Sequence, residues 1–104
     1  MPTRYVTLAT GRRIPDPRGT QAWRRLAKRA AREEPVCWLQ LEGCTRVSTT
    51  GDHLETVADH PELALVRANV RGACAPCNEK RGGLPLSALR HAAAARPPAL
   101  SIFD

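Results

Sequence analysis

The chain has 104 residues, of which 42% are hydrophobic and only 4% aromatic, and it carries a formal net charge of +6. A chain of this length supports one domain with a small core, and no apolar run approaches the roughly 20 residues that a transmembrane helix requires. The composition excludes a membrane-spanning protein, and the basic charge suits either a polyanionic partner such as nucleic acid or simply a solvated basic face.

Residues 1–19 are rich in proline and glycine, so they predict a weakly ordered N-terminal arm with one short strand near Tyr5. Thr20 is a typical helix N-cap, and apolar residues recur after it at helical spacing, so we expect a helix that ends before Pro35. Its apolar stripe should face the core. Its basic residues lie mostly on the other side, where they meet phosphates or water: Arg24, Arg25, Lys28, Arg29 and Arg32.

The rest of the chain predicts short strands and helices. Strands are expected over residues 47–54 and 69–73, and helices from Asp59, over 74–81 as far as Gly82-Gly83, and over 87–95. One domain would therefore span residues 20–95, with a C-terminal tail over 96–104.

Four cysteines lie in two pairs, Cys37 with Cys44 and Cys74 with Cys77. The N-terminus lacks the apolar stretch of a secretory signal, so we expect a reducing, cytoplasmic location, where thiols seldom persist as disulfides. Metal coordination is therefore favoured over a disulfide framework. The second pair has the standard spacing of a zinc knuckle, whereas six residues separate the first pair. Together they predict a closed structural zinc site with four cysteine ligands, which holds the fold together and performs no chemistry.

The order of the remaining polar residues between and beyond the cysteines is also informative. Asp52-His53 follows the first pair, Asn69 precedes the second pair, and Asn78 directly follows it. With the four cysteines, this order resembles the HNH endonucleases, nucleases of the ββα-metal fold, in the zinc-containing form common among bacteriophage. The resemblance covers residues 20–83. It implies an α+β fold: a small ββα-metal (HNH) core with a structural four-cysteine zinc site, a lead-in helix and a C-terminal helix.

The resemblance also implies roles for the site residues. Asp52 would be a ligand of one catalytic divalent cation, and His53 would be the general base that deprotonates the attacking water. Asn69 would hold that base in position by hydrogen bonding. Asn78 stands where the family name implies a histidine, and its amide oxygen would be a second ligand, so Mg²⁺ or Mn²⁺ is expected there rather than zinc or nickel.

Gly51, the other histidines, the two tryptophans and three basic residues also carry predictions. Neighbouring residues on a strand point to opposite faces, so a shared site for Asp52 and His53 predicts a bend or bulge at Gly51. His60 and His91 are interpreted as solvated histidines, and the two tryptophans, Trp23 and Trp38, as packing residues. Phosphate contacts are expected from three basic residues: Arg71, Lys80 and Arg81.

The function that the resemblance implies is metal-dependent hydrolysis of DNA phosphodiester bonds in the cytoplasm of a bacterial host cell. Double-stranded DNA is the expected partner, a phage terminase is a further one if the chain acts in DNA packaging, and the oligomeric state is left open. Two alternatives remain. A non-catalytic zinc module that binds nucleic acid explains the charge and the cysteines, and a secreted, disulfide-bonded cationic protein explains the cysteines alone.

Overall fold

The computed structural model describes residues 3–89. Its elements, in chain order, are β1 (Tyr5–Thr7), β2 (Arg13–Pro15), the 3-10 turn η1 (Pro17–Gly19), α1 (Gln21–Glu33), β3 (Thr50–His53), the 3-10 turns η2 (Pro61–Leu63) and η3 (Arg67–Asn69), β4 (Val70–Ala73) and α2 (Ala75–Arg81). A helical turn begins at Leu86, but most of the expected helix over 87–95, the tail over 96–104 and His91 lie outside the described residues. Within the described part, no helix is long and apolar enough to cross a membrane.

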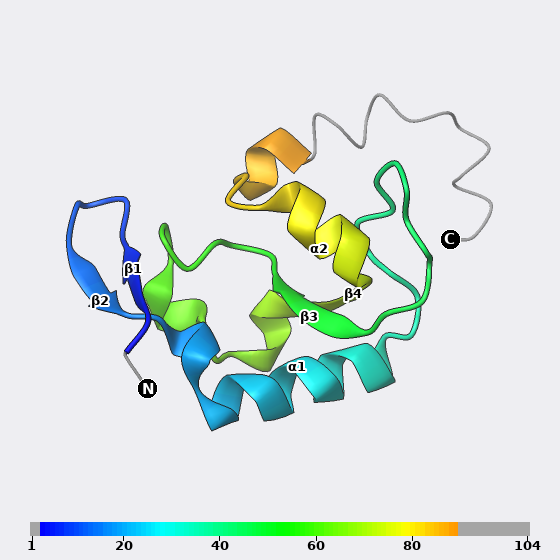
Figure 1. The fold of residues 1–104 in the computed structure, drawn as a ribbon, viewed down its shortest axis with the longest axis horizontal. Coiled ribbons are helices and arrows are strands. Elements are labelled where there is room, and N and C mark those ends of the chain that lie inside the picture. Colours follow the sequence, from blue (N-terminus) through cyan, green and yellow to red (C-terminus); the bar gives the residue numbers. More distant parts are fainter. Residues whose placement is uncertain (1–2, 90–104) are drawn as a thin grey trace.

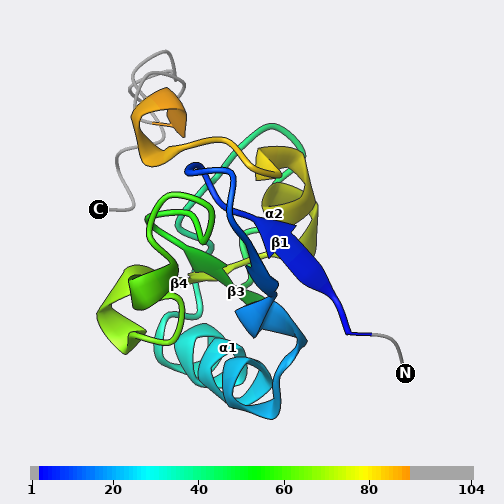
Figure 2. The ribbon, with the colours of Figure 1, turned by 90° about the vertical axis from the view of Figure 1, so that its left-hand side faces the viewer.

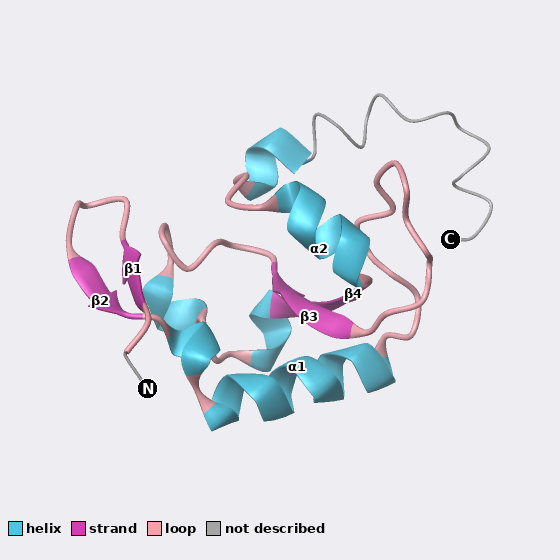
Figure 3. Ribbon diagram, in the orientation of Figure 1, coloured by secondary structure: helices cyan, strands magenta, loops and turns pink. Residues whose placement is uncertain are grey.

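The centre of the molecule is the antiparallel pair of β3 and β4, which lies between two helices (Figures 1 and 2). Helix α1 packs against both strands, and α2 lies on the other side of the pair and directly follows β4. A second antiparallel pair, β1 with β2, stands beside this centre (Figure 3). The arrangement is a small α+β fold, as the sequence predicts.

Helix α1 forms where the sequence predicts it. The Thr20 hydroxyl accepts a hydrogen bond from the Trp23 backbone N–H at 3.1 Å, which caps the first turn. Ala27 and Ala30 are buried against the strands. The approach is close because Gly51 has no side chain: a Cβ there would lie 2.9 Å from the Ala27 Cα. Small residues on both sides therefore fix the distance between helix and sheet.

Ion pairs connect the C-terminal end of α1 to β4 and to the segment before it. Glu34 accepts hydrogen bonds from Arg67 at 2.8 Å and from Arg71 at 3.1 Å. These bonds hold the pKa of Glu34 below its ordinary value even though burial opposes them. The network links the helix to the segment that leads into β4.

Residues 3–19 are more regular than the weakly ordered arm that the sequence predicts. β1 lies where one strand is expected, but β2 and η1 have no predicted counterpart. The hairpin is joined to the loop after β3 by a hydrogen bond from Ala9 N to Ala58 O at 2.8 Å. Asp16, which is buried, anchors the following turn through ion pairs with two arginines. Composition misses this order because it depends on contacts between distant residues.

The later elements match their predictions with local differences. β3 is shorter than the strand expected over 47–54, although backbone hydrogen bonds from Thr49 N to Ala73 O and from Leu54 N to Asn69 O flank it, and Val47 forms an isolated bridge with Val36. The helix expected from Asp59 is the short turn η2, because the Asp59 carboxylate bonds the Thr56 hydroxyl instead of capping a helix. α2 ends at Gly82, whose φ of 54° is in the left-handed region that favours glycine.

Candidate functional sites

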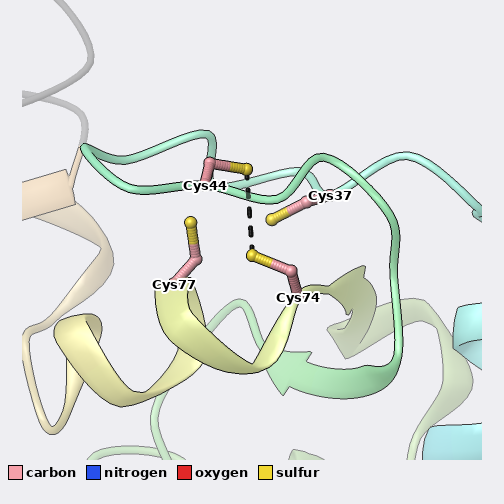
Figure 4. Close-up of side chains that lie close together, drawn as sticks. All are labelled: Cys37, Cys44, Cys74 and Cys77. Carbon is pink, nitrogen blue, oxygen red and sulfur yellow. Dashed lines mark hydrogen bonds between the residues drawn. The ribbon is translucent and has the colours of Figure 1, made fainter.

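The four cysteines come together in one cluster. Their Sγ atoms all lie within 4.8 Å of one another. Two of the cysteines are at the start of α2 and two are on the loop that faces it (Figure 4). The Cys44 and Cys74 sulfurs are 3.8 Å apart, and four sulfurs at about 2.3 Å from a tetrahedral zinc ion are separated by about 3.8 Å. All four residues are free thiols, so the predicted cluster can hold a metal ion.

The surroundings of the cluster suit thiolate ligands. Cys37, Cys74 and Cys77 are buried, so the site is closed. The backbone N–H groups of Leu41 and Arg46 donate to the sulfurs of Cys77 and Cys44 at 3.3 and 3.2 Å. Such donors stabilise the deprotonated form, whereas burial raises the pKa of both thiols. A divalent cation must therefore displace protons as it binds, and its charge offsets the cost of burying thiolates.

The long spacing of the first pair is explained by the path of the loop. Gln40, Gly43 and Arg46 all have positive φ values, between 49° and 83°. Gln40 and Gly43, which lie between the two cysteines, turn the chain back on itself, so that Cys44 reaches the same cluster as Cys37 although six residues intervene. The sequence shows Gly43 as a turn residue but gives no sign of the other two.

The polar residues predicted as a catalytic group also meet. Asp52, His53 and Asn78 line a single cavity of about 320 Å³, together with residues from the N-terminal arm, α1, β3 and the end of α2: Arg4, Arg18, Trp23, Thr50, Gly51, Glu79 and Gly82. Asp52 and His53 are buried at the end of β3, and Asn78 lies in α2. The structure therefore brings the three residues to one place.

The predicted bend at Gly51 is wrong. β3 pairs with β4 one residue to one residue, from Thr50 opposite Ala73 to His53 opposite Val70, with no bulge. Asp52 contacts Trp38 and Arg81, while His53 contacts Trp23 of α1. The two side chains thus keep to opposite faces of the strand. They share a cavity because β3 is paired on one edge only, so its open edge can be reached from both faces.

Asp52 is held by two donors. Its Oδ2 accepts hydrogen bonds from Arg81 Nη1 at 2.6 Å and from Trp38 Nε1 at 3.1 Å. Burial raises the pKa of Asp52, and the Arg81 guanidinium opposes that rise. No hydrogen bond from the described part of the chain falls on Oδ1.

His53 is fixed on two sides. Its Nε2 lies 2.8 Å from the Ala64 carbonyl oxygen, which can only accept, so the neutral ring carries its proton on Nε2 and its lone pair on Nδ1. The ring also stacks on Trp23, with 4.4 Å between centroids and 18° between planes. Burial lowers the pKa of His53, although the Ala64 bond opposes this, and therefore favours the neutral imidazole.

Asn69 acts on the loop rather than directly on the imidazole. Its side chain accepts from Glu55 N at 2.9 Å and donates to Glu55 O at 3.1 Å and Leu63 O at 3.3 Å. Leu63 is adjacent to Ala64, whose carbonyl receives the His53 hydrogen bond. Asn69 can therefore position the base through the backbone, and its catalytic role stays a prediction.

The three predicted phosphate contacts have different surroundings. Arg71 is half-buried and paired with Glu34. Lys80 is exposed, with its Nζ 2.9 Å from the Glu42 carbonyl oxygen. Arg81 is buried, and its donors go to Asp52 and to the carbonyl oxygens of His53, Leu54 and Leu84. The phosphate roles stay predictions, and the contacts of Arg81 favour a positioning role.

Sequence reasoning assigned no function to several residues that line the cavity or contact its lining. Arg4 and Arg18 come from the arm that was expected to be weakly ordered. Trp38 packs on the cysteine cluster as predicted, but it also donates to Asp52. Trp23 sits on the predicted apolar stripe, which gave no sign of its contact with His53. His60 lies outside the cavity, 45% exposed and paired with acidic neighbours, in line with the predicted solvated histidine.

A hard cation in the cavity would have few protein ligands. Among residues 3–89, the cysteine cluster is the only group of three or more His, Cys, Asp or Glu side chains close enough to hold a metal by themselves. A second cation would therefore rely on Asp52, the Asn78 amide and water. Mg²⁺ is commonly bound in this way, through one or two protein oxygens, several waters and substrate phosphates.

Comparison of the chain with protein-family models, with curated protein sequences and with solved structures finds no match.

Proposed function

We propose that the chain is a metal-dependent DNA endonuclease of the HNH type, with a zinc ion in the cysteine cluster. The observation that carries the proposal is the shared cavity of Asp52, His53 and Asn78. The order β3, β4, α2, with the cysteine pair Cys74 and Cys77 at the start of the helix, agrees with the ββα arrangement that the resemblance implies.

In this proposal His53 is the general base. The hydrogen bond to Ala64 O fixes the tautomer, so the Nδ1 lone pair is free to take a proton from a water as that water attacks phosphorus. Stacking on Trp23 limits rotation of the ring. Burial lowers the pKa of His53 and so favours the neutral imidazole, which is the form that a base requires.

Asp52 and Asn78 hold the catalytic cation in this proposal. Mg²⁺ or Mn²⁺ would polarise the scissile phosphate and stabilise the leaving oxygen. Arg81 favours the ionised form of Asp52 and orients it, since it holds the carboxylate through Oδ2. The cysteine cluster is at the first turn of α2, so a zinc ion there would fix the helix that carries Asn78.

DNA is the proposed substrate. The net charge is +6, and exposed basic residues cover the outer side of α1, where Arg24, Arg25 and Lys28 are available for phosphates. One cavity serves one phosphodiester, so a single chain should nick one strand. The resemblance suggests that the chain acts beside a phage terminase during DNA packaging, inside a bacterial host cell.

Nicking of supercoiled plasmid tests the proposal. The zinc-loaded protein should nick with Mg²⁺ or Mn²⁺ and not without them, and His53→Ala should reduce the rate by at least about 10²-fold, the usual share of a general base. His60→Ala is the matched control, because it removes an exposed histidine outside the cavity. Equal nicking by the parent and His53→Ala would refute the proposal.

A zinc module that binds nucleic acid without cutting it is the second candidate. It is favoured by the Asp52–Arg81 ion pair, which already satisfies one oxygen of the proposed cation ligand. That candidate predicts DNA binding without nicking under any divalent cation, and equal binding by the parent and His53→Ala.

A further inference from the structure

Two arginines of the N-terminal arm reach the proposed catalytic cavity. Arg4 and Arg18 line the 320 Å³ cavity beside Asp52, His53 and Asn78. Arg18 also lines an adjoining cavity of about 160 Å³, which again includes Asp52 and His53. Arg18 therefore stands where the two cavities meet.

A buried carboxylate holds Arg18 in place. The Asp16 side chain is 1% exposed. Its Oδ1 accepts from the Arg18 backbone N–H and from Arg18 Nε, both at 2.9 Å, and its Oδ2 accepts from Arg18 Nη2 at 2.9 Å. Arg4 Nε approaches the same Oδ2 at 3.2 Å. Asp16 thus fixes one edge of the Arg18 guanidinium and orients the second arginine.

The other edge of the guanidinium remains available. The Arg18 side chain is 36% exposed, and no other side-chain partner of Arg18 occurs within residues 3–89, so Nη1 and the second N–H of Nη2 are open to a ligand. The Arg18 guanidinium is planar and Asp16 already sets its orientation, so the side chain loses little further entropy when it binds an oxyanion. Arg4, Arg18 and Asp16 together carry one net positive charge.

We infer that Arg18, positioned by Asp16, binds a non-bridging oxygen of the phosphodiester that lies in the cavity beside His53. The inference rests on the proposed nuclease function and adds to it a substrate-binding residue from outside the segment that resembles HNH enzymes. A guanidinium matches the geometry of a phosphate through two parallel N–H donors. The hairpin and η1 are then part of the substrate site rather than an accessory arm.

Direct DNA binding separates this inference from the proposed cleavage. Zinc-loaded protein in the His53→Ala background, which should not cut, is titrated into a labelled duplex of about 20 base pairs, and the dissociation constant is measured by fluorescence anisotropy across a salt series. Arg18→Gln should weaken binding about tenfold and reduce the salt slope by about 1, the effect of losing one phosphate contact. Arg12→Gln is the matched control, since Arg12 is an exposed arginine of the hairpin outside both cavities.

Two further variants keep the test decisive. Arg18→Lys retains the charge and the pairing with Asp16 but loses the fork, so it should fall between the parent and Arg18→Gln. Asp16→Asn loosens Arg18 but also removes one negative charge, so a loss of affinity in this variant, against the gain that the charge change alone would give, supports positioning by Asp16. Zinc content and thermal melting are measured for each variant. If Arg18→Gln disturbs folding, the dissociation constant of Arg18→Lys is compared with that of the parent instead.

The outcomes are distinct. Equal binding by Arg18→Lys, Arg18→Gln and the control would overturn the inference and leave Arg18 as a structural partner of Asp16. A loss confined to the Arg18 variants supports it. If the parent fails to nick plasmid yet the Arg18 effect persists, the proposed catalysis fails while an oxyanion contact at Arg18 stands.

Discussion

The ion pair between Arg81 and Asp52 gives the most quantitative prediction. Both side chains are buried, with exposed fractions of 1% and 9%, and their nearest atoms are 2.6 Å apart. Arg81→Met keeps much of the apolar stem but leaves the Asp52 carboxylate in the interior with Trp38 as its remaining donor. Breaking a buried pair by removing one partner costs about 3–5 kcal/mol, a large part of the ~5–15 kcal/mol that stabilises a small domain.

The free energy of unfolding, measured by urea denaturation of the zinc-loaded protein, should therefore fall by about 3–5 kcal/mol in Arg81→Met. Asp52→Asn removes the stranded charge, so the double variant should be more stable than the sum of the two single losses predicts, with a coupling of about 1–3 kcal/mol. A loss below about 1 kcal/mol in Arg81→Met, or strictly additive losses, would refute the account of Arg81 as the residue that orients Asp52.

Three other predictions follow from the fold and the charge. Cys74→Ser should lose bound zinc and the cooperative thermal transition, because metal binding contributes directly to folding; a variant that melts like the parent would contradict the structural role of the cluster. Gly51→Ala should destabilise the protein by about 1–3 kcal/mol, because the added Cβ would lie 2.9 Å from the backbone of α1. Gly83→Ala, at a site with open space, should be nearly neutral in the same urea measurement, and equal losses would refute the close packing. Replacing Arg24 and Lys28 by Gln should lower the slope of DNA affinity against salt by about 2, and an unchanged slope would show that this face meets only water.

The parts of the structure that the sequence predicts are those with local causes. Thr20 and the apolar spacing after it define α1, and Gly82 ends α2, because capping and backbone conformation act within a few residues. The Cys74–Cys77 knuckle predicts a metal cluster, since its spacing alone places two sulfurs together. The meeting of Asp52, His53 and Asn78 was expected only from the resemblance.

The parts that the sequence misses depend on contacts between distant segments. The burial of Asp16 and the reach of Arg18 into the cavity follow from docking of the hairpin on the loop after β3, which composition cannot show. The bulge expected at Gly51 is absent, since β3 pairs with β4 residue for residue, and the open edge of β3 gives access to both faces without one. Gly51 has a different purpose, which is close packing against α1.

The central claim is that His53 acts as the base, and chemical rescue tests it most directly. His53→Gly leaves space beside Trp23 within the existing cavity, so added imidazole can take the place of the missing ring. Nicking by zinc-loaded His53→Gly with Mg²⁺ should be lost and then restored at least about tenfold by imidazole, in proportion to its neutral form, while His60→Gly needs no rescue. A folded, zinc-containing His53→Gly protein that nicks like the parent, or that imidazole fails to restore, would contradict the claim.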